Sequence, residues 1–432
     1  MLGAFANAFR TPDLRRKLLF VLLIVTVFRF GSQVPTPGVH VANVQNCLEG
    51  VQDQSLYSLI NLFSGGALLQ LTVFALGIMP YITASIILQL LVVVIPRLEA
   101  LKKEGQSGQA KITQYTRYLT LGLAVLQATG MVALARSRSL FQGCDLPLLH
   151  NEDSVASFLV MVITMTAGTA VIMWLGEQIT ERGVGNGMSI LIFCQVVATF
   201  PGSLWDVKVR LGWGTFAIVL AIGLALVAGV VFIEQAQRRI PVQYARRMVG
   251  RKMFGGNSTY IPLKVNQAGI IPVIFASSLL SLPGMAVQFN QSSDNPVIKF
   301  FNEYLVGGDH PLYMALFFAM IIFFTYFYVS ITFNPEEVAD NMKKYGGFVP
   351  GIRAGRATEQ YLSYVLSRLT FPGSLYLGLI SLVPLIAFAV INANQNFPFG
   401  GTSILIMVGV ALDTVKQIES QLQQRNYEGF LR

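Results

Sequence analysis

One uncharged run constrains this chain more than any other feature. Residues 54–96, which end in NLFSGGALLQLTVFALGIMPYITASIILQLLVVVIP (61–96), contain no Asp, Glu, Lys or Arg. A continuous helix of roughly forty residues would be about 60 Å long, twice the ~30 Å hydrocarbon thickness of a bilayer. The run is too long for one span and too short for two spans plus a turn, and Gly65-Gly66 and Pro80 interrupt it. We therefore expect a short helix that enters the membrane and turns back, which requires surrounding protein or a cavity.

The composition places the chain in a membrane. Hydrophobic residues make up 53% of it and charged residues only 12%, whereas soluble domains carry roughly 25% charged residues. Cys47, Cys144 and Cys194 are too few and too scattered for a disulfide framework or a metal site, so we expect small apolar filler. The start of the chain shows no apolar signal-peptide core, and we expect a retained cytoplasmic segment there.

Ten apolar runs have the length of a membrane span. They cover residues 18–34, 72–95, 115–135, 155–176, 187–200, 215–233, 268–289, 312–331, 370–391 and 401–418. We expect the fifth to end at Pro201-Gly202, because proline and glycine together interrupt a helix. The sequence thus predicts an all-α polytopic membrane protein with ten transmembrane helices.

The distribution of Lys and Arg sets the orientation, because cytoplasmic loops carry an excess of both. With a cytoplasmic N-terminus, 25 of the 31 fall on the cytoplasmic side and five outside, so we expect both termini in the cytoplasm. Ten spans divide into five and five, which predicts two inverted five-helix halves related by a pseudo-two-fold axis in the membrane plane. The expected segments are 1–17 (cytoplasmic), 18–200 (first half), 201–213 (external hinge loop), 214–418 (second half) and 419–432 (cytoplasmic tail).

Two cytoplasmic loops, 236–266 and 332–369, are far longer than a connection needs, and both are basic. The first carries paired basic residues before a GGN tip, which suggests a protruding strand or helix pair. The second is expected to form a helix after Pro335 and a Gly/Pro-rich turn. Their charge fits topology signalling and binding of anionic lipid headgroups. Their length favours a docking platform for an anionic partner, with any nucleic acid contacted through its backbone.

The membrane interior offers aliphatic rather than ionisable side chains. The few charged residues near the spans, which we expect to be structural pairs or interface residues, are Arg29, Glu177, Glu234 and Asp413. The sequence has no phosphate-binding loop, metal pattern or Ser/His/Asp set. Ile78, Ile82 and Ile86 recur every four residues and share one helix face. This pattern fits core packing or, beside a re-entrant segment, a hydrophobic constriction that closes a pore by excluding water.

Eight motifs carry a resemblance to a known family. They are PTPGV (35–39), NLFSGGAL (61–68), FALGIMPYITASI (74–86), ERGVGNGMSI (181–190), PLKVNQAGIIPVIFASS (262–278), FNPEEVADNMKK (333–344), FVPGIRAGRATEQYL (348–362) and FGGTSILI (399–406). With its ten spans and two long loops, the chain resembles the SecY/Sec61-alpha family of protein-translocation channels over essentially its whole length.

The resemblance implies three parts of a channel. A plug helix at about residues 57–69 would fill the outward funnel, with Tyr57, Leu59, Ile60, Asn61, Leu62, Phe63, Ser64, Gly65 and Gly66. A pore ring would consist of Ile78, Ile82, Ile192, Ile274 and Ile406, with Met188 and Ile86 close by. A lateral gate would lie between the second and seventh spans, where Gln89 and Asn266 match its polar positions. A hydrogen bond between these two would be worth about 0.5–2 kcal/mol, and the alternative is that both are solvated by headgroups.

The resemblance also implies the partners. The docking surface for the SecA motor ATPase and the ribosome would include Arg353, Arg356, Arg246, Arg247, Arg251 and Lys252, the last four against ribosomal RNA phosphates. The expected partners are the SecE and SecG subunits, SecA, the ribosome, preproteins with signal sequences, anionic lipids, SecDF and YidC. No cofactor or metal is expected.

Together these features predict a passive protein-conducting channel in the bacterial cytoplasmic membrane. It would move unfolded preproteins outward and release transmembrane segments sideways, using energy supplied by partners, and it would not be an enzyme. A secondary transporter would need a polar or ionisable site at the midplane, where the sequence has isoleucine. A structural scaffold for membrane insertion would open no water-filled path when the plug is deleted.

Overall fold

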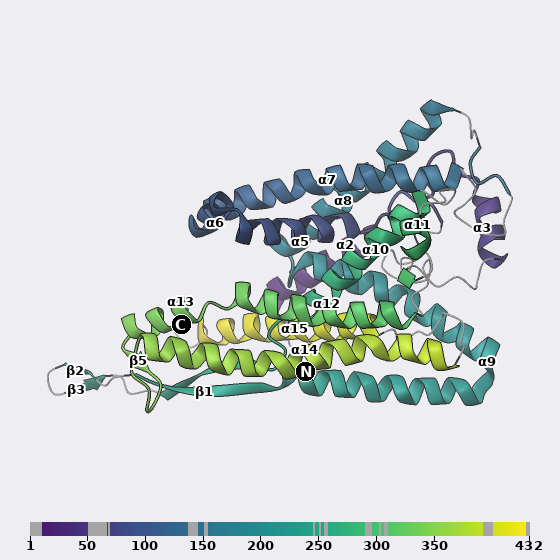
Figure 1. Ribbon diagram of the computed structural model, residues 1–432. Helices are drawn as coiled ribbons and strands as arrows, with labels where there is room; N and C mark the ends of the chain where they lie inside the picture. Colours follow the sequence, from purple (N-terminus) through teal and green to yellow (C-terminus); the bar gives the residue numbers. More distant parts are fainter. Residues whose placement is uncertain are drawn as a thin grey trace.

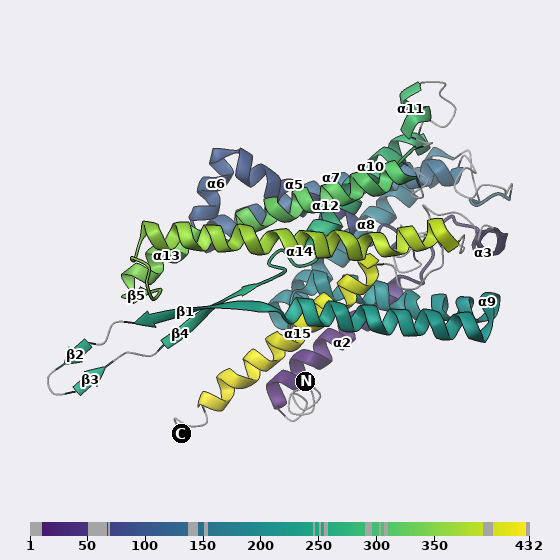
Figure 2. The ribbon, with the colours of Figure 1, turned by 60° about the horizontal axis from the view of Figure 1, so that its bottom comes forward.

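The computed structural model describes residues 11–50, 67, 70–136, 146–150, 154–244, 247–249, 252–254, 258–289, 296–301, 304–305, 310–391 and 401–428. The residues of the predicted plug, from Tyr57 to Gly66, lie outside these ranges. Within them the chain is mainly helical, and its long helices run between two ends of the molecule (Figures 1 and 2). The strands gather at one end, and the short helices α3 and α11 lie at the other.

Each of the ten predicted spans corresponds to a helix. These helices are α2 (Pro12–Gly31), α5 (Met79–Val94), α7 (Gln106–Arg136), α8 (Val155–Arg182), α9 (Gly187–Gln235, which holds two spans), α10 (Ile271–Phe289), α12 (Pro311–Thr332), α14 (Arg356–Ile391) and α15 (Gly401–Glu428). The short helices are α3 (Val41–Gly50), α6 (Pro96–Lys103), α11 (Pro296–Phe301) and α13 (Pro335–Lys344). By length and composition alone, five helices among the described residues could cross a membrane, or six if the bent pair α5–α6 is one span.

The start of the second span and the end of the fifth were predicted wrongly. The second span starts at Met79 instead of residue 72, because residues 70–78 form turns and Pro80 lies in the first helical turn, where its missing N–H costs nothing. The fifth span does not end at Pro201-Gly202. Pro201 lies inside α9, which departs from helical geometry at Gly212 (φ 82°, ψ 175°), so residues 201–211 of the expected hinge loop are helical. One proline removes a single backbone hydrogen bond, whereas a positive φ at glycine redirects the chain.

The helices form two packed series joined by α9. In the first half, α5 packs on α7, α7 on α8 and α8 on α9. In the second, α10 packs on α12, α12 on α14 and α14 on α15. Helix α15 also packs along α9, and α10 touches α5. The two series therefore meet where α5, α9, α10 and α15 converge.

The segments before and after residues 51–66, which lie outside the described ranges, are hydrogen-bonded to each other and to residues 148–150. Thr36 N donates to Leu71 O at 3.0 Å, and Val73 N donates to Val34 O at 2.9 Å. The chain after α2 also pairs with residues 148–150, where His40 N donates to Leu148 O at 2.8 Å. Cys47, on α3, is buried and disulfide-bonded, with its partner outside the described residues. The expectation that all cysteines are apolar filler was wrong for Cys47, because a disulfide depends on spatial and not sequence proximity.

The first long loop forms an antiparallel strand pair, which confirms the strand alternative. Strands β1 (Gln237–Tyr244) and β4 (Ser258–Lys264) pair over their length, and β2 (Arg247–Val249) and β3 (Lys252–Phe254) form a second pair toward the tip. Strand β5 (Gly347–Phe348) comes from the second long loop and adds to β1, so the sheet order is β4-β1-β5. The two loops thus build one small domain (Figure 2).

Candidate functional site

Four predicted ring residues meet in one apolar cluster where the two helical series converge. Ile78 precedes the first turn of α5, Met188 and Ile192 lie on α9, and Ile406 lies on α15. Their exposed fractions are 1%, 9%, 7% and 1%. Ile82, one turn further along α5, packs against the same cluster. The cluster therefore joins residues from both halves.

The remaining two ring candidates lie toward α10. Ile86 belongs to a second buried cluster with Val273 and Phe275 of α10, and Ile82 contacts both clusters. Ile274 is buried (7% exposed) between those two α10 residues in sequence, but it belongs to neither cluster. The structure thus brings five of the seven candidates around one cluster, places Ile86 in the adjoining one, and leaves Ile274 beside them on α10.

Glycines in the ERGVGNG motif let α8 and α9 come close enough to place Met188. A Cβ at Gly187, the last residue of this motif, would collide with the backbone oxygen of Gly176 on α8, so only glycine fits there. The Asn186 side chain caps α9 by accepting from Met188 N at 3.1 Å, and the Thr180 hydroxyl accepts from Gly187 N at 2.9 Å. These contacts fix the start of α9 and with it the orientation of Met188 and Ile192.

The predicted hydrogen bond between Gln89 and Asn266 is not made. Gln89 is exposed on α5, whereas Asn266 is buried (2% exposed) in the turn before α10. The Asn266 amide nitrogen donates to Glu234 Oε1 and to Gly269 O. Its oxygen, Oδ1, is buried without a partner. The amide is thus held through its nitrogen, because a carboxylate at the end of α9 is the stronger acceptor.

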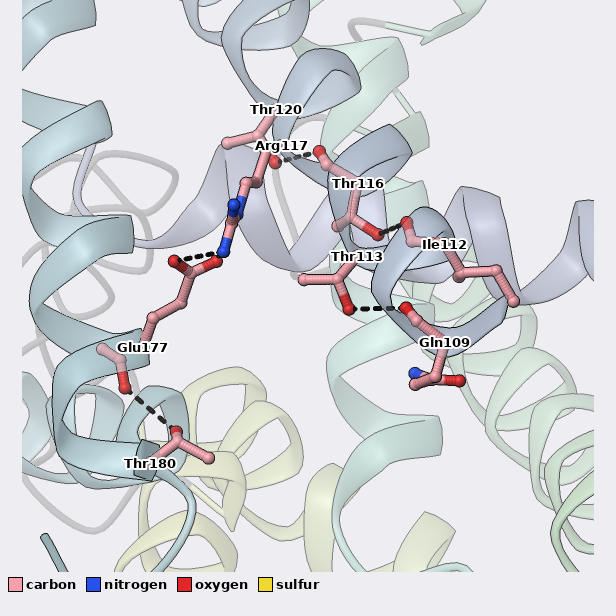
Figure 3. A network of polar contacts seen from close by, with 9 residues as sticks. Gln109, Ile112, Thr113, Thr116, Arg117, Thr120, Glu177 and Thr180 are labelled. Carbon is pink, nitrogen blue, oxygen red and sulfur yellow. Dashed lines mark hydrogen bonds and ion pairs between the residues drawn. The ribbon is translucent and has the colours of Figure 1, made fainter. Parts of the chain in front are cut away.

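Three of the four charged residues near the spans, Glu177, Glu234 and Asp413, have side-chain partners, as expected. Arg117 of α7 donates to Glu177 of α8 through Nε at 2.7 Å and Nη2 at 2.9 Å, a bidentate pair (Figure 3). Nζ of Lys264 lies 3.6 Å from Oδ1 of Asp413. The buried Glu234 carboxylate accepts a hydrogen bond from the Asn266 amide. Around the Arg117 pair, threonine hydroxyls donate to backbone carbonyls of the preceding helical turn, for example Thr116 to Ile112 O at 3.0 Å (Figure 3). Such bonds satisfy polar groups inside an apolar environment.

The basic docking candidates lie at the strand-rich end. Arg353 is exposed between Gly351 and Gly355, which have φ of 83° and 99°, and its carbonyl accepts from the Thr358 hydroxyl at 2.9 Å. Arg356 is exposed as the first residue of α14. Arg247 and Lys252 lie in β2 and β3, and Arg246 and Arg251 lie outside the described residues.

A buried core supports this basic surface. Ile240, Val242 and Leu263 of the sheet pack against Met342 of α13 and Leu362 of α14. The helix predicted after Pro335 is confirmed as α13, which Asn334 caps by accepting from Glu336 N at 3.2 Å. The Arg353 turn is therefore mounted on a small folded domain instead of a free loop.

Sequence reasoning missed three features of the site. The Glu234–Asn266 contact joins residues 32 positions apart, and no local pattern signals it. The pairing of β5 with β1 links two separate loops. Lys208 lies over the rings of Trp205 and Trp213, and here the i, i+3 spacing of Trp205 and Lys208 was an available signal.

Comparison with known proteins agrees with this geometry. The SecY family profile matches residues 72–415. The chain is 66% identical to a protein translocase subunit SecY of Streptomyces scabiei and 58% identical to one of Mycobacterium bovis, over 100% of each chain.

Solved structures share the fold. A structure described as a protein conducting channel superposes with a TM-score of 0.63 at 20% identity, covering 94% of this chain and 91% of the other. Sec61 in a canine ribosome-channel complex from the endoplasmic reticulum gives a TM-score of 0.59 at 19% identity, with the same coverage. At these identities the solved structures establish the shared fold alone.

Proposed function

We propose a channel mechanism for this chain from the premise that it belongs to the SecY family. Membership makes it the protein-conducting channel subunit of the Sec translocase, a multi-pass protein of the bacterial cytoplasmic membrane. It is a transporter and not an enzyme. The energy for transport would then come from partners.

The pore is closed by the ring of Ile78, Ile82, Ile192, Ile274 and Ile406, with Met188 and Ile86 beside it. One observation carries this assignment: the buried cluster contains residues of α5, α9 and α15, and so lies where the two halves meet. Separation of the halves at this place opens a path between them. Aliphatic side chains make no directional bonds, so they can fit around any passing residue while they deny ions a polar path.

The gate opens between α5 and α10, which touch in the described structure. Glu234 and Gly269 O occupy the nitrogen of Asn266 and leave Oδ1 without a partner. An amide donor such as Gln89 can therefore bind Oδ1 when the helices shift, without breaking the contact to Glu234. The plug, at about residues 57–69, fills the outward funnel in the closed state, and the described chain on both sides of it is hydrogen-bonded within the first half.

The basic domain built from the two long loops docks the cytoplasmic partners. Arg353 and Arg356 face the SecA motor, and the β2–β3 region, with Arg246, Arg247, Arg251 and Lys252, faces ribosomal RNA phosphates. Exposure of Arg353 on a folded support favours this role. SecE and SecG complete the complex, SecDF and YidC assist it, and anionic lipids surround it. The chain divides into a first half at 18–200 and a second at 214–418, with the turn between them as hinge and cytoplasmic ends at 1–17 and 419–432.

Photo-crosslinking tests the pore assignment. A photoreactive residue at Ile82 is expected to crosslink to a stalled preprotein in proteoliposomes that hold the full translocase. The same probe at Ile172, buried in the same cluster but on α8, is the matched control and should not crosslink. If neither position crosslinks while the vesicles transport, the pore has been misplaced.

A further inference from the structure

The turn inside α9 lies at the outer membrane surface. Gly212 redirects the chain there, between the apolar helical stretches 187–202 and 212–235. Both views show α9 reaching the end of the molecule that carries α3 and α11, opposite to the strands β1–β3 (Figures 1 and 2). The basic strand-rich end is cytoplasmic by its charge. Residues near Gly212 therefore lie at the level of the outer-leaflet headgroups.

A lysine lies between two tryptophan rings at this turn. Nζ of Lys208 is 4.1 Å from the ring centroid of Trp205 and 4.2 Å from that of Trp213. The rings are 61% and 71% exposed, and Trp213 makes an edge contact with Phe216 at 6.1 Å. Two of the chain's three tryptophans are used here. Tryptophan is enriched at membrane interfaces, where its amphipathic ring suits the headgroup region.

The two rings leave the N–H donors of the ammonium group open to an oxygen acceptor from outside the described chain. None of the ion pairs formed by described residues includes Lys208. An aromatic face attracts a cation through its quadrupole, but it does not replace the oxygen acceptors that three N–H donors require. The two rings thus hold the charge in place without neutralising it.

We propose that Lys208, Trp205 and Trp213 form a binding site for the phosphate of an anionic phospholipid in the outer leaflet. The phosphate oxygens accept from the ammonium group, and the rings flank the glycerol region. The acyl chains lie along the exposed apolar face of α9 below the turn, where Ile218 and Ile222 follow each other by four residues. This adjoining apolar surface favours a lipid over a free anion.

The site would tie the connection between the two halves to the bilayer. Trp205 precedes Gly212 and Trp213 follows it, so one bound lipid touches both arms of the turn. The lipid site stands on the Lys208 geometry alone, whereas its effect on hinge motion rests on the proposed function.

Fluorescence quenching by brominated lipids tests the site in the full chain. In a Trp174→Phe background, Trp205 and Trp213 are the only tryptophans. The protein is placed in phosphatidylcholine nanodiscs that contain either dibrominated phosphatidylglycerol or dibrominated phosphatidylcholine in equal amounts. We expect stronger quenching by the anionic lipid. Lys208→Gln should remove this preference, and Lys208→Arg should keep it.

Two controls define the ligand. Lys299→Gln changes another outer-side lysine, on α11, and should keep the preference for the anionic lipid. Inorganic phosphate at millimolar concentration should also leave it unchanged. Equal quenching by the two lipids in the parent protein, or a preference that survives Lys208→Gln, would overturn the proposal. Loss of the preference on adding inorganic phosphate would show a free-anion site instead and would overturn the assignment to lipid.

Discussion

Replacing Ile406 by asparagine separates a pore-lining role from a core-packing role. Ile406 is 1% exposed in the cluster that joins the two halves. Removing a buried isoleucine side chain forfeits about 2–3 kcal/mol of burial, and burying an amide costs roughly 1–3 kcal/mol more. The free energy of unfolding should therefore fall by about 3–6 kcal/mol, a large but not unprecedented loss. Ile172 of α8 has the same exposure in the same cluster, so Ile172→Asn should be destabilised equally.

The two variants should differ in ion leak. At a constriction, the amide of Ile406→Asn offers water a hydrogen-bonding partner that isoleucine lacks. A gain of about 2 kcal/mol for water in the ring corresponds to roughly a 30-fold rise in permeability, since 1.4 kcal/mol is tenfold. Ile172→Asn places its amide on a helix outside the ring and should not raise the leak. Ile406→Val, which costs about 0.5–1.5 kcal/mol, should change neither property much.

The assay is single-channel conductance in planar bilayers, with thermal unfolding of the same preparations. Equal leak from Ile406→Asn and Ile172→Asn would mean that leak follows general destabilisation. No leak from either variant would mean that the cluster is an ordinary core and that the ring assignment is wrong.

Three further predictions concern docking and stability. Arg353→Glu should abolish motor-driven transport and leave thermal stability unchanged, whereas Arg368→Glu, which removes a cation over Tyr364, should transport; normal transport by Arg353→Glu would contradict docking. Glu177→Gln should lower the free energy of unfolding by about 1–2 kcal/mol, because it weakens the bidentate pair with Arg117. The loss is modest because the Arg117 side chain is 44% exposed to solvent. In an Arg117→Ala background, Glu177→Gln should change stability little. Cys47→Ser should cost about 2–5 kcal/mol, and reductant should lower the melting temperature of the parent protein only, so an unaffected parent would argue against the disulfide.

Short-range signals in the sequence predicted the helices well. Each apolar run became a helix, because a backbone in lipid must satisfy its hydrogen bonds within itself. The strand pair and α13 were also predicted from local patterns. Helix α13 has Pro335 and acidic residues in its first turn and Lys343 and Lys344 in its last turn, an arrangement that the helix dipole stabilises. Helix α14 begins at Arg356, well before its predicted apolar run, because the cytoplasmic domain packs on residues such as Leu362.

The errors arose where distant residues decide the structure. Proline usually interrupts a helix, so Pro201 was expected to end the fifth span. The chain instead changes direction at Gly212, because glycine can adopt a positive φ and proline cannot. The Gln89–Asn266 pair was inferred without knowledge of the buried carboxylate that competes for the amide. Glu234 reaches Asn266 only after the β1–β4 pair brings the end of α9 next to the start of α10, as the bond from Val265 N to Ala236 O at 3.0 Å shows.

That last contact links the proposed docking surface to the proposed gate. Strands β1 and β4 connect directly to the end of α9 and to the turn before α10, and Asn266 lies in that turn. A force applied to the strand pair by a cytoplasmic partner acts first on the Glu234–Asn266 contact. Because the Asn266 oxygen is buried without a partner, a small shift of β4 can bring a donor to that oxygen while the nitrogen stays bonded to Glu234. Under the proposed function, the strand pair is therefore placed to convert partner binding into movement at the start of α10, the helix that contacts α5 at the proposed gate.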